Sequence, residues 1–194
     1  MVGKSVGKLG HMRLHEILLE RWREVKPYHG AKTAMDEQTT MLCAALTDWI
    51  GGEHGRAEVQ QELLELAPVA AHYARTEAKW LYRGFALDYR KLEDLKTKRG
   101  FDIAIQAAAP LTSWSTDRYV CESFMEGFGK WVVFRKPAAS LNVFCNLVLF
   151  NQIVKPFSRM DEQKEIIVRM PETMHVKATD IVVRSWNRKN TYYD

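Results

Sequence analysis

Residues 111–127 read LTSWSTDRYVCESFMEG and contain the change of pattern on which the fold depends. A short β-type run with small hydroxyl residues leads into a helix, expected over residues 116–127, whose first turn Ser115 or Thr116 can cap. The buried stripe of that helix is expected to contain Val120, Cys121 and Phe124. Because another hydroxyl caps the helix, Ser113 has no evident structural duty and is a candidate site residue.

On both sides of this segment the chain consists mostly of short runs with β-branched and aromatic residues, separated by prolines. Strands are expected at residues 79–87, 102–107, 131–134, 142–150, 164–168 and 176–185. Alternation should turn Ser113 and Ser115 to one side of their strand and Trp114 to the other.

The N-terminal part has helical periodicity, with apolar faces expected over residues 12–25, 36–50 and 56–74. Gly51 and Gly52 stop the second helix, and Pro68 should kink or split the third. Helices followed mostly by strands favour an α+β fold. We therefore expect a helical lobe over residues 1–75 and a second domain over residues 76–194.

Composition excludes several classes of protein. Hydrophobic residues make up 46% and charged residues 27%, as in ordinary globular proteins, and no apolar run reaches the roughly 18 residues needed to cross a membrane. The three cysteines are scattered in apolar surroundings, which favours buried thiols in a cytoplasmic, reducing compartment. The six histidines lack metal-ligand spacing, so no metal is expected. A net charge of +4 permits nucleic-acid binding, but no basic stripe argues for it.

Three segments carry candidate chemistry, although each also has a structural explanation. Arg83 lies in an apolar run and is followed by Gly84; it can bind phosphate or carboxylate, or lie on an exposed strand edge. Ser113 ends a strand, where hydroxyls commonly act in capping. Glu165 opens a hydrophobic strand with Gln163 on the same face, and a carboxylate there can simply protect a strand edge.

The order of these segments resembles the Arg-Ser-Glu group of mono-ADP-ribosyltransferases: Arg-Gly on a first strand, Ser-x-Ser before a helix, then Gln-x-Glu opening a late strand. The resemblance covers residues 77–184. The helical lobe and total length are similar to small phage-encoded enzymes that modify host proteins, which would place this chain in the host cytoplasm. Two departures are Trp114 between the serines and Gln163 in place of the second Glu of arginine-modifying members.

The resemblance implies a β-sandwich of two small sheets and NAD as co-substrate, without a metal. It implies that Glu165 stabilises the positive charge that develops on the ribose and that Ser113 anchors the ribose and positions Glu165. Arg83 would hold the NAD phosphates, and the main chain of Gly84 would bind the nicotinamide amide. Two aromatic residues, Tyr82 and Trp114, are candidates for covering the nicotinamide ring.

In the same resemblance Gln163 contacts the acceptor, and residues 157–162 correspond to target-recognition turns. An amide cannot act as a base toward a guanidinium, so a host-protein side chain other than arginine is the expected acceptor. Two alternatives remain open. One is the same fold with water or nucleic acid as acceptor, and the other is a non-catalytic binding module.

Overall fold

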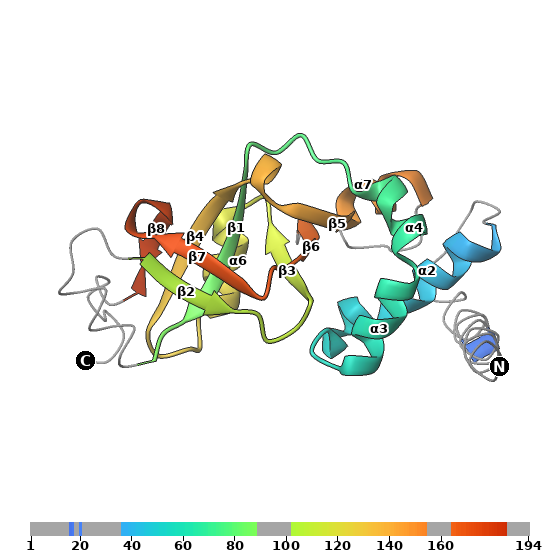
Figure 1. The fold of residues 1–194 in the computed structure, drawn as a ribbon, viewed down its shortest axis with the longest axis horizontal. Coiled ribbons are helices and arrows are strands. Elements are labelled where there is room, and N and C mark those ends of the chain that lie inside the picture. Colours follow the sequence, from blue (N-terminus) through green and yellow to red (C-terminus); the bar gives the residue numbers. More distant parts are fainter. Residues whose placement is uncertain (1–15, 18–19, 21–35, 89–101, 155–163, 186–194) are drawn as a thin grey trace, which may run out of the picture. The chain divides into compact units, whose positions relative to one another are not determined.

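A computed structural model describes residues 16–17, 20, 36–88, 102–154 and 164–185 (Figure 1). The described residues form two compact units: those within 1–75 and 144–162, and those within 76–143 and 163–194. The expected helix over residues 12–25 therefore lies almost wholly outside the described residues. Within them, no helix has both the length and the apolar character needed to span a membrane.

Residues 16, 17 and 20 are helical, and the first helix of this unit with defined bounds is α2 (Glu37–Asp48), inside the predicted range 36–50. Asp36 caps it, because its Oδ1 accepts from the main-chain N–H of Thr39 at 2.7 Å. A wider turn, η1 (Trp49–Glu53), follows, and Gly52 adopts φ 94°, a left-handed conformation that glycine adopts without steric cost. The predicted stop at the two glycines is thus confirmed.

The predicted third helix is split, as expected from its proline. The pieces are α3 (Ala57–Glu65), α4 (Ala67–Ala70) and η2 (Ala71–Tyr73). Pro68 occupies the first turn of α4, where its missing N–H needs no partner.

The strand prediction for residues 142–150 is wrong in its second half. A strand, β5 (Asn142–Asn146), is followed at once by α7 (Leu147–Val154). The Asn146 side chain ends the strand, because its Oδ1 accepts from Leu149 N–H at 3.2 Å in the first turn of the helix. Phe150 then packs edge-on against Tyr73 of the same unit, with ring centroids 4.7 Å apart. A continuous apolar run does not distinguish a buried helix from a buried strand.

The main sheet of the described residues has six strands in the order β5–β6–β3–β1–β4–β8. Besides β5, its strands are β1 (Trp80–Ala86), β3 (Leu111–Ser115), β4 (Trp131–Pro137), β6 (Glu165–Arg169) and β8 (Ile181–Arg184). The pairings of β6 with β3, β3 with β1, β1 with β4 and β4 with β8 are antiparallel. With the helices that precede them, these strands confirm the α+β class.

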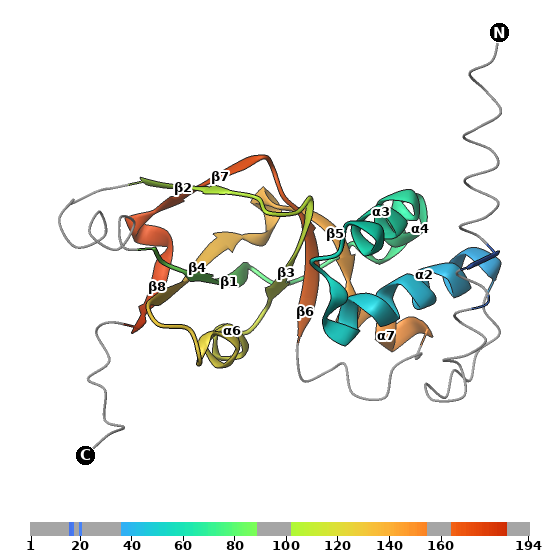
Figure 2. The ribbon, with the colours of Figure 1, turned by 90° about the horizontal axis from the view of Figure 1, so that it is seen from below.

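A second, two-stranded sheet pairs β2 (Asp102–Gln106) with β7 (Thr173–Lys177). Figure 2 shows this pair on one side of the main sheet and the helix α6 (Arg118–Met125) on the other. The core between the two sheets includes Leu81, Trp114, Phe134, Ile166, Val168, Ile103, Ile105, Met174 and Val176. The run predicted as one strand over residues 176–185 is in fact two strands, because the turn η5 (Ala178–Asp180) separates β7 from β8.

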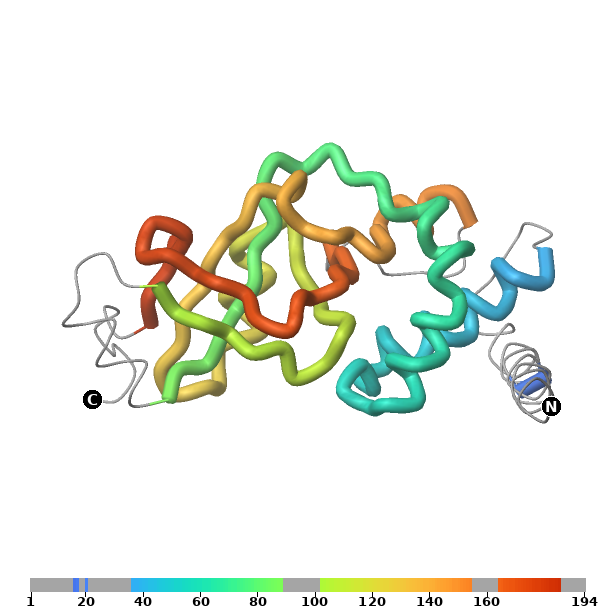
Figure 3. Tube along the Cα trace, in the orientation of Figure 1, coloured from blue at the N-terminus to red at the C-terminus, as the bar shows by residue number. Residues whose placement is uncertain are grey.

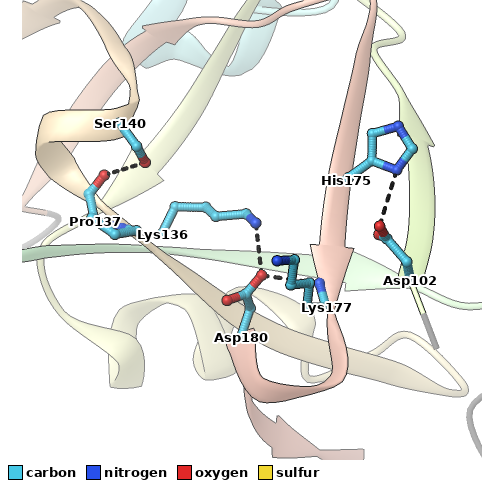
Figure 4. Close-up of polar contacts among 7 residues, drawn as sticks. All are labelled: Asp102, Lys136, Pro137, Ser140, His175, Lys177 and Asp180. Carbon is cyan, nitrogen blue, oxygen red and sulfur yellow. Dashed lines mark hydrogen bonds and ion pairs between the residues drawn. The ribbon is translucent and has the colours of Figure 1, made fainter. Parts of the chain in front are cut away.

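Asp180 stabilises the turn between β7 and β8 (Figure 4). Its Oδ2 accepts from Lys177 N–H at 2.9 Å and lies 2.6 Å from the Nζ of Lys136 on β4. Both charged side chains are about four-fifths buried, so the ion pair lies in a medium less polar than water. The trace in Figure 3 follows the chain through this turn from β7 into β8.

The helix after β3 forms where predicted, but two details of the prediction are wrong. Its N-cap is Asp117, whose Oδ1 accepts from Tyr119 N–H at 2.9 Å; Ser115 Oγ instead accepts from Asp117 N–H at 3.0 Å. Phe124 is 65% exposed, and the buried residues of α6 are Cys121, Glu122 and Met125. The face of α6 that packs on the sheet contains Cys121 and Met125, four residues apart, and leaves Phe124 on the exposed side.

Candidate functional site

Glu165 and Ser113 come together on adjacent strands, β6 and β3. Ser113 lies opposite Ile167, and Ser115 lies opposite Glu165, so the side chains of Ser113, Ser115 and Glu165 share one face of the sheet. The Ser113 hydroxyl donates a hydrogen bond to Glu165 Oε1. Trp114 lies on the opposite face, as the alternation predicts. The shared face is the one that α6 covers, because Tyr82 lies opposite Ser115 and packs with residues of α6.

Arg83 reaches Ser113 through a gap between strands. β1 and β3 share one paired position, Tyr82 opposite Ser115, and beyond it the strands are no longer paired. There the Nη1 of Arg83 donates to the main-chain oxygen of Ser113. Arg83 alternates with Leu81 and Phe85, which pack on the inter-sheet core, so its side chain starts from the face opposite Ser113 and Glu165. Ser113 therefore contacts both other groups: its hydroxyl bonds to Glu165 on β6, and its main-chain oxygen accepts from Arg83 on β1.

The guanidinium of Arg83 has no carboxylate neighbour within 4 Å among the residues that the structure describes. Burial lowers the pKa of Arg83, because removal from water disfavours the charged form, although a guanidinium stays protonated at neutral pH. Its one hydrogen bond to a described residue is that to Ser113. No enclosed side-chain nitrogen or oxygen of the described residues lacks a partner, so the remaining guanidinium nitrogens have accessible surface. They can donate to an anionic ligand.

Gly84 has a packing role that the sequence did not reveal. A Cβ placed on Gly84 would lie 2.3 Å from Met125 Cγ and 2.6 Å from Met125 Sδ. The glycine therefore lets α6 lie directly against β1. Gly84 thus has a structural explanation besides the ligand-binding role that the resemblance implies for its main chain.

The two aromatic candidates for covering a ligand ring differ in their surroundings. Trp114 is 2% exposed, its Nε1 donates to Thr112 Oγ1 at 3.1 Å, and its ring meets that of Phe134 edge-on at 5.4 Å. Its indole is enclosed in the inter-sheet core, which argues against contact with a ligand, and its role in covering the nicotinamide ring stays a prediction. Tyr82 is half-buried and packs with the residues of α6.

Gln163 and residues 157–162 lie outside the described residues, so their predicted roles stay predictions. Lys164, the residue before Glu165, was not a candidate in the sequence but has a notable contact in the structure. Its Nζ lies 2.9 Å from Asp117 Oδ2, at the N-terminus of α6. Forty-seven positions separate these two residues, and no local sequence pattern links them.

The described part of the chain shows no group of three or more His, Cys, Asp or Glu side chains arranged to hold a metal ion. The assembled groups are a hydroxyl, a carboxylate and a guanidinium. The carboxylate can stabilise a developing positive charge, the hydroxyl can orient that carboxylate, and the guanidinium can bind a phosphate. Comparison of the chain with protein-family models, with curated proteins and with solved structures gives no match.

Proposed function

We propose that this protein is a mono-ADP-ribosyltransferase that cleaves NAD and transfers ADP-ribose to a side chain of a host protein. Its fold would then be the β-sandwich of two small sheets, with an N-terminal helical lobe, that is typical of the Arg-Ser-Glu group. The six-stranded and two-stranded sheets with a shared core are compatible with that architecture.

The observation that carries the proposal is the hydrogen bond from the Ser113 hydroxyl to Glu165, beside a guanidinium bound to the same serine. Three segments that resemble ADP-ribosyltransferase motifs, and that are far apart in the sequence, thus meet at one place. Glu165 is only 8% exposed, and a carboxylate at such a position needs hydrogen-bond partners, of which Ser113 is one.

In the proposed reaction, the bond between nicotinamide and ribose breaks and positive charge develops at the anomeric carbon. A fixed Glu165 carboxylate stabilises that charge more than it stabilises bound NAD, and therefore lowers the barrier. Its enclosure strengthens the electrostatic attraction. Ser113 holds the carboxylate in place, so that little reorganisation is needed during the reaction.

Arg83 would bind the diphosphate of NAD through the guanidinium nitrogens that described residues leave free. Among the described residues it has no carboxylate partner, which supports this role because a partly desolvated cation gains most from an anionic ligand. The bond to Ser113 would hold the guanidinium plane in a fixed orientation.

The first test uses labelled NAD and host lysate, with Glu165→Gln compared with wild type. Glutamine keeps an oxygen that can accept from Ser113 but loses the negative charge, so we expect labelling to fall by about 10²–10³-fold. Glu172→Gln is the matched control, because Glu172 is exposed on the turn before β7 and should label as wild type does. Equal labelling by Glu165→Gln and wild type would refute the proposed function.

The acceptor is tested by mass spectrometry of the labelled protein. Modification of an amide or another weak nucleophile is expected from Gln163, and ADP-ribose on arginine would overturn that part of the proposal. Label on added RNA or DNA in place of protein would favour a nucleic-acid acceptor. Absence of NAD binding at millimolar concentration in calorimetry would favour a non-catalytic module.

A further inference from the structure

Lys164, the residue before Glu165, has an unusual main-chain conformation. Its φ is +47°, and no other non-glycine residue in the described ranges has a positive φ. Side chains with a Cβ rarely adopt this left-handed region, because the Cβ comes close to the following carbonyl oxygen. Such a conformation persists only when surrounding contacts determine it, and it is found often at functional sites.

Two contacts hold Lys164 in this conformation. The main-chain N–H of Thr116 donates to the Lys164 carbonyl at 3.1 Å, which extends the β3–β6 pairing by one position. The Lys164 ammonium donates to Asp117 Oδ2 at 2.9 Å. Lys164 is therefore bound at both its carbonyl and its side chain to the turn that joins β3 to α6.

The two carboxylate oxygens of Asp117 accept hydrogen bonds from different donors. Its Oδ1 caps α6 by accepting from Tyr119 N–H, and its Oδ2 accepts from Lys164. Because Lys164 holds the carboxylate in its ionised form, the pKa of Asp117 is lowered, and the Tyr119 N–H adds to this effect. The cap and the ion pair can therefore be separated by mutation, since asparagine caps helices as well as aspartate does.

We propose that Lys164 and Asp117 are positioning residues that fix where β6 begins and thereby hold the Glu165 carboxylate on Ser113. This inference rests on the proposed function of Glu165. A change at the residue before a strand shifts the first side chain of that strand most. Loss of the ion pair should therefore weaken the orientation of Glu165 while leaving the guanidinium of Arg83, and hence NAD binding, in place.

The experiment measures NAD cleavage and NAD affinity for Lys164→Met, Asp117→Asn and the double variant. Each single variant should lower kcat about three- to fivefold, in the range that a half-exposed ion pair supplies, with KM and the calorimetric Kd for NAD unchanged. The double variant should be no slower than the slower single variant, because both remove the same contact. Lys164→Arg should restore most of the rate. Lys130→Met, which removes an exposed lysine after α6, is the matched control and should match wild type.

A second readout is independent of catalysis. Carboxyl NMR should show the pKa of Asp117 below its ordinary value in wild type and closer to that value in Lys164→Met. If wild type cleaves NAD, three results would each overturn this inference alone. They are an unchanged kcat in the single variants, additive effects in the double variant, and an Asp117 pKa that is the same in wild type and Lys164→Met. A wild type that shows the shifted Asp117 pKa but cleaves no NAD would refute the proposed function, and the catalytic role of the pair with it.

Discussion

Gly84→Ala tests the contact between α6 and the strand that carries Arg83. The added Cβ would lie 2.3 Å from Met125 Cγ and 2.6 Å from Met125 Sδ, well inside van der Waals contact. Met125 is 8% exposed, and the Cγ atom is near its main chain, so a rotation at the end of the side chain does not relieve the overlap. The main-chain oxygen of Cys121, 3.4 Å away, limits movement of the helix itself.

The expected magnitude follows from two opposing terms. Overpacking of this kind costs about 1–3 kcal/mol, while replacing glycine by alanine in a strand gains roughly 0.5–1 kcal/mol. We therefore expect Gly84→Ala to lower the free energy of unfolding by about 1–2 kcal/mol. Met125→Ala alone should cost about 2–5 kcal/mol, because it leaves a cavity.

The decisive measurement is the double variant Gly84→Ala/Met125→Ala in urea unfolding followed by circular dichroism. Once Met125 is truncated, the new methyl group fills part of the vacated space, so the double variant should be more stable than the sum of the single effects predicts, by about 1 kcal/mol or more. Additivity to within about 0.5 kcal/mol would refute the packing argument. So would a Gly84→Ala protein as stable as wild type.

Two further predictions concern ionisable groups. The pKa of Asp117 in the folded protein is below its ordinary value of 3.8. Its ion pair with Lys164 therefore contributes stability above that pH, and this contribution is lost as the pH falls through the folded-state pKa. Lys164→Met should thus be less stable than wild type at pH 7, with the difference shrinking toward pH 3 in urea titrations; a constant difference would contradict this. Burial raises the pKa of Cys43 to about 12 and that of Cys121 to about 11. Neither thiol should therefore react with a thiol reagent at pH 8 until denaturant is added. Rapid labelling of the native protein would contradict the enclosed position of these side chains.

Local sequence determined most of the secondary structure. The Asp36 cap, the stop at Gly52, the split at Pro68 and the alternation around Trp114 depend on near neighbours in the chain, so their physical causes can be read from the residues. The secondary-structure predictions were wrong where the local sequence is compatible with two structures and tertiary packing determines which one forms. The apolar run from Leu147 forms a helix, and Phe124 faces solvent.

The candidate site, too, could be predicted from the sequence only in part. The residue types of Arg83, Ser113 and Glu165, and their order, are visible in the chain, and so is the resemblance that they carry. Their meeting depends on the pairing of β3 with β6 and on the gap between β1 and β3, which are contacts over 30 or more positions. The enclosure of Trp114 and the link from Lys164 to Asp117 depend on the same long-range register. Strand register sets which side chains become neighbours, and only the folded sheet fixes that register.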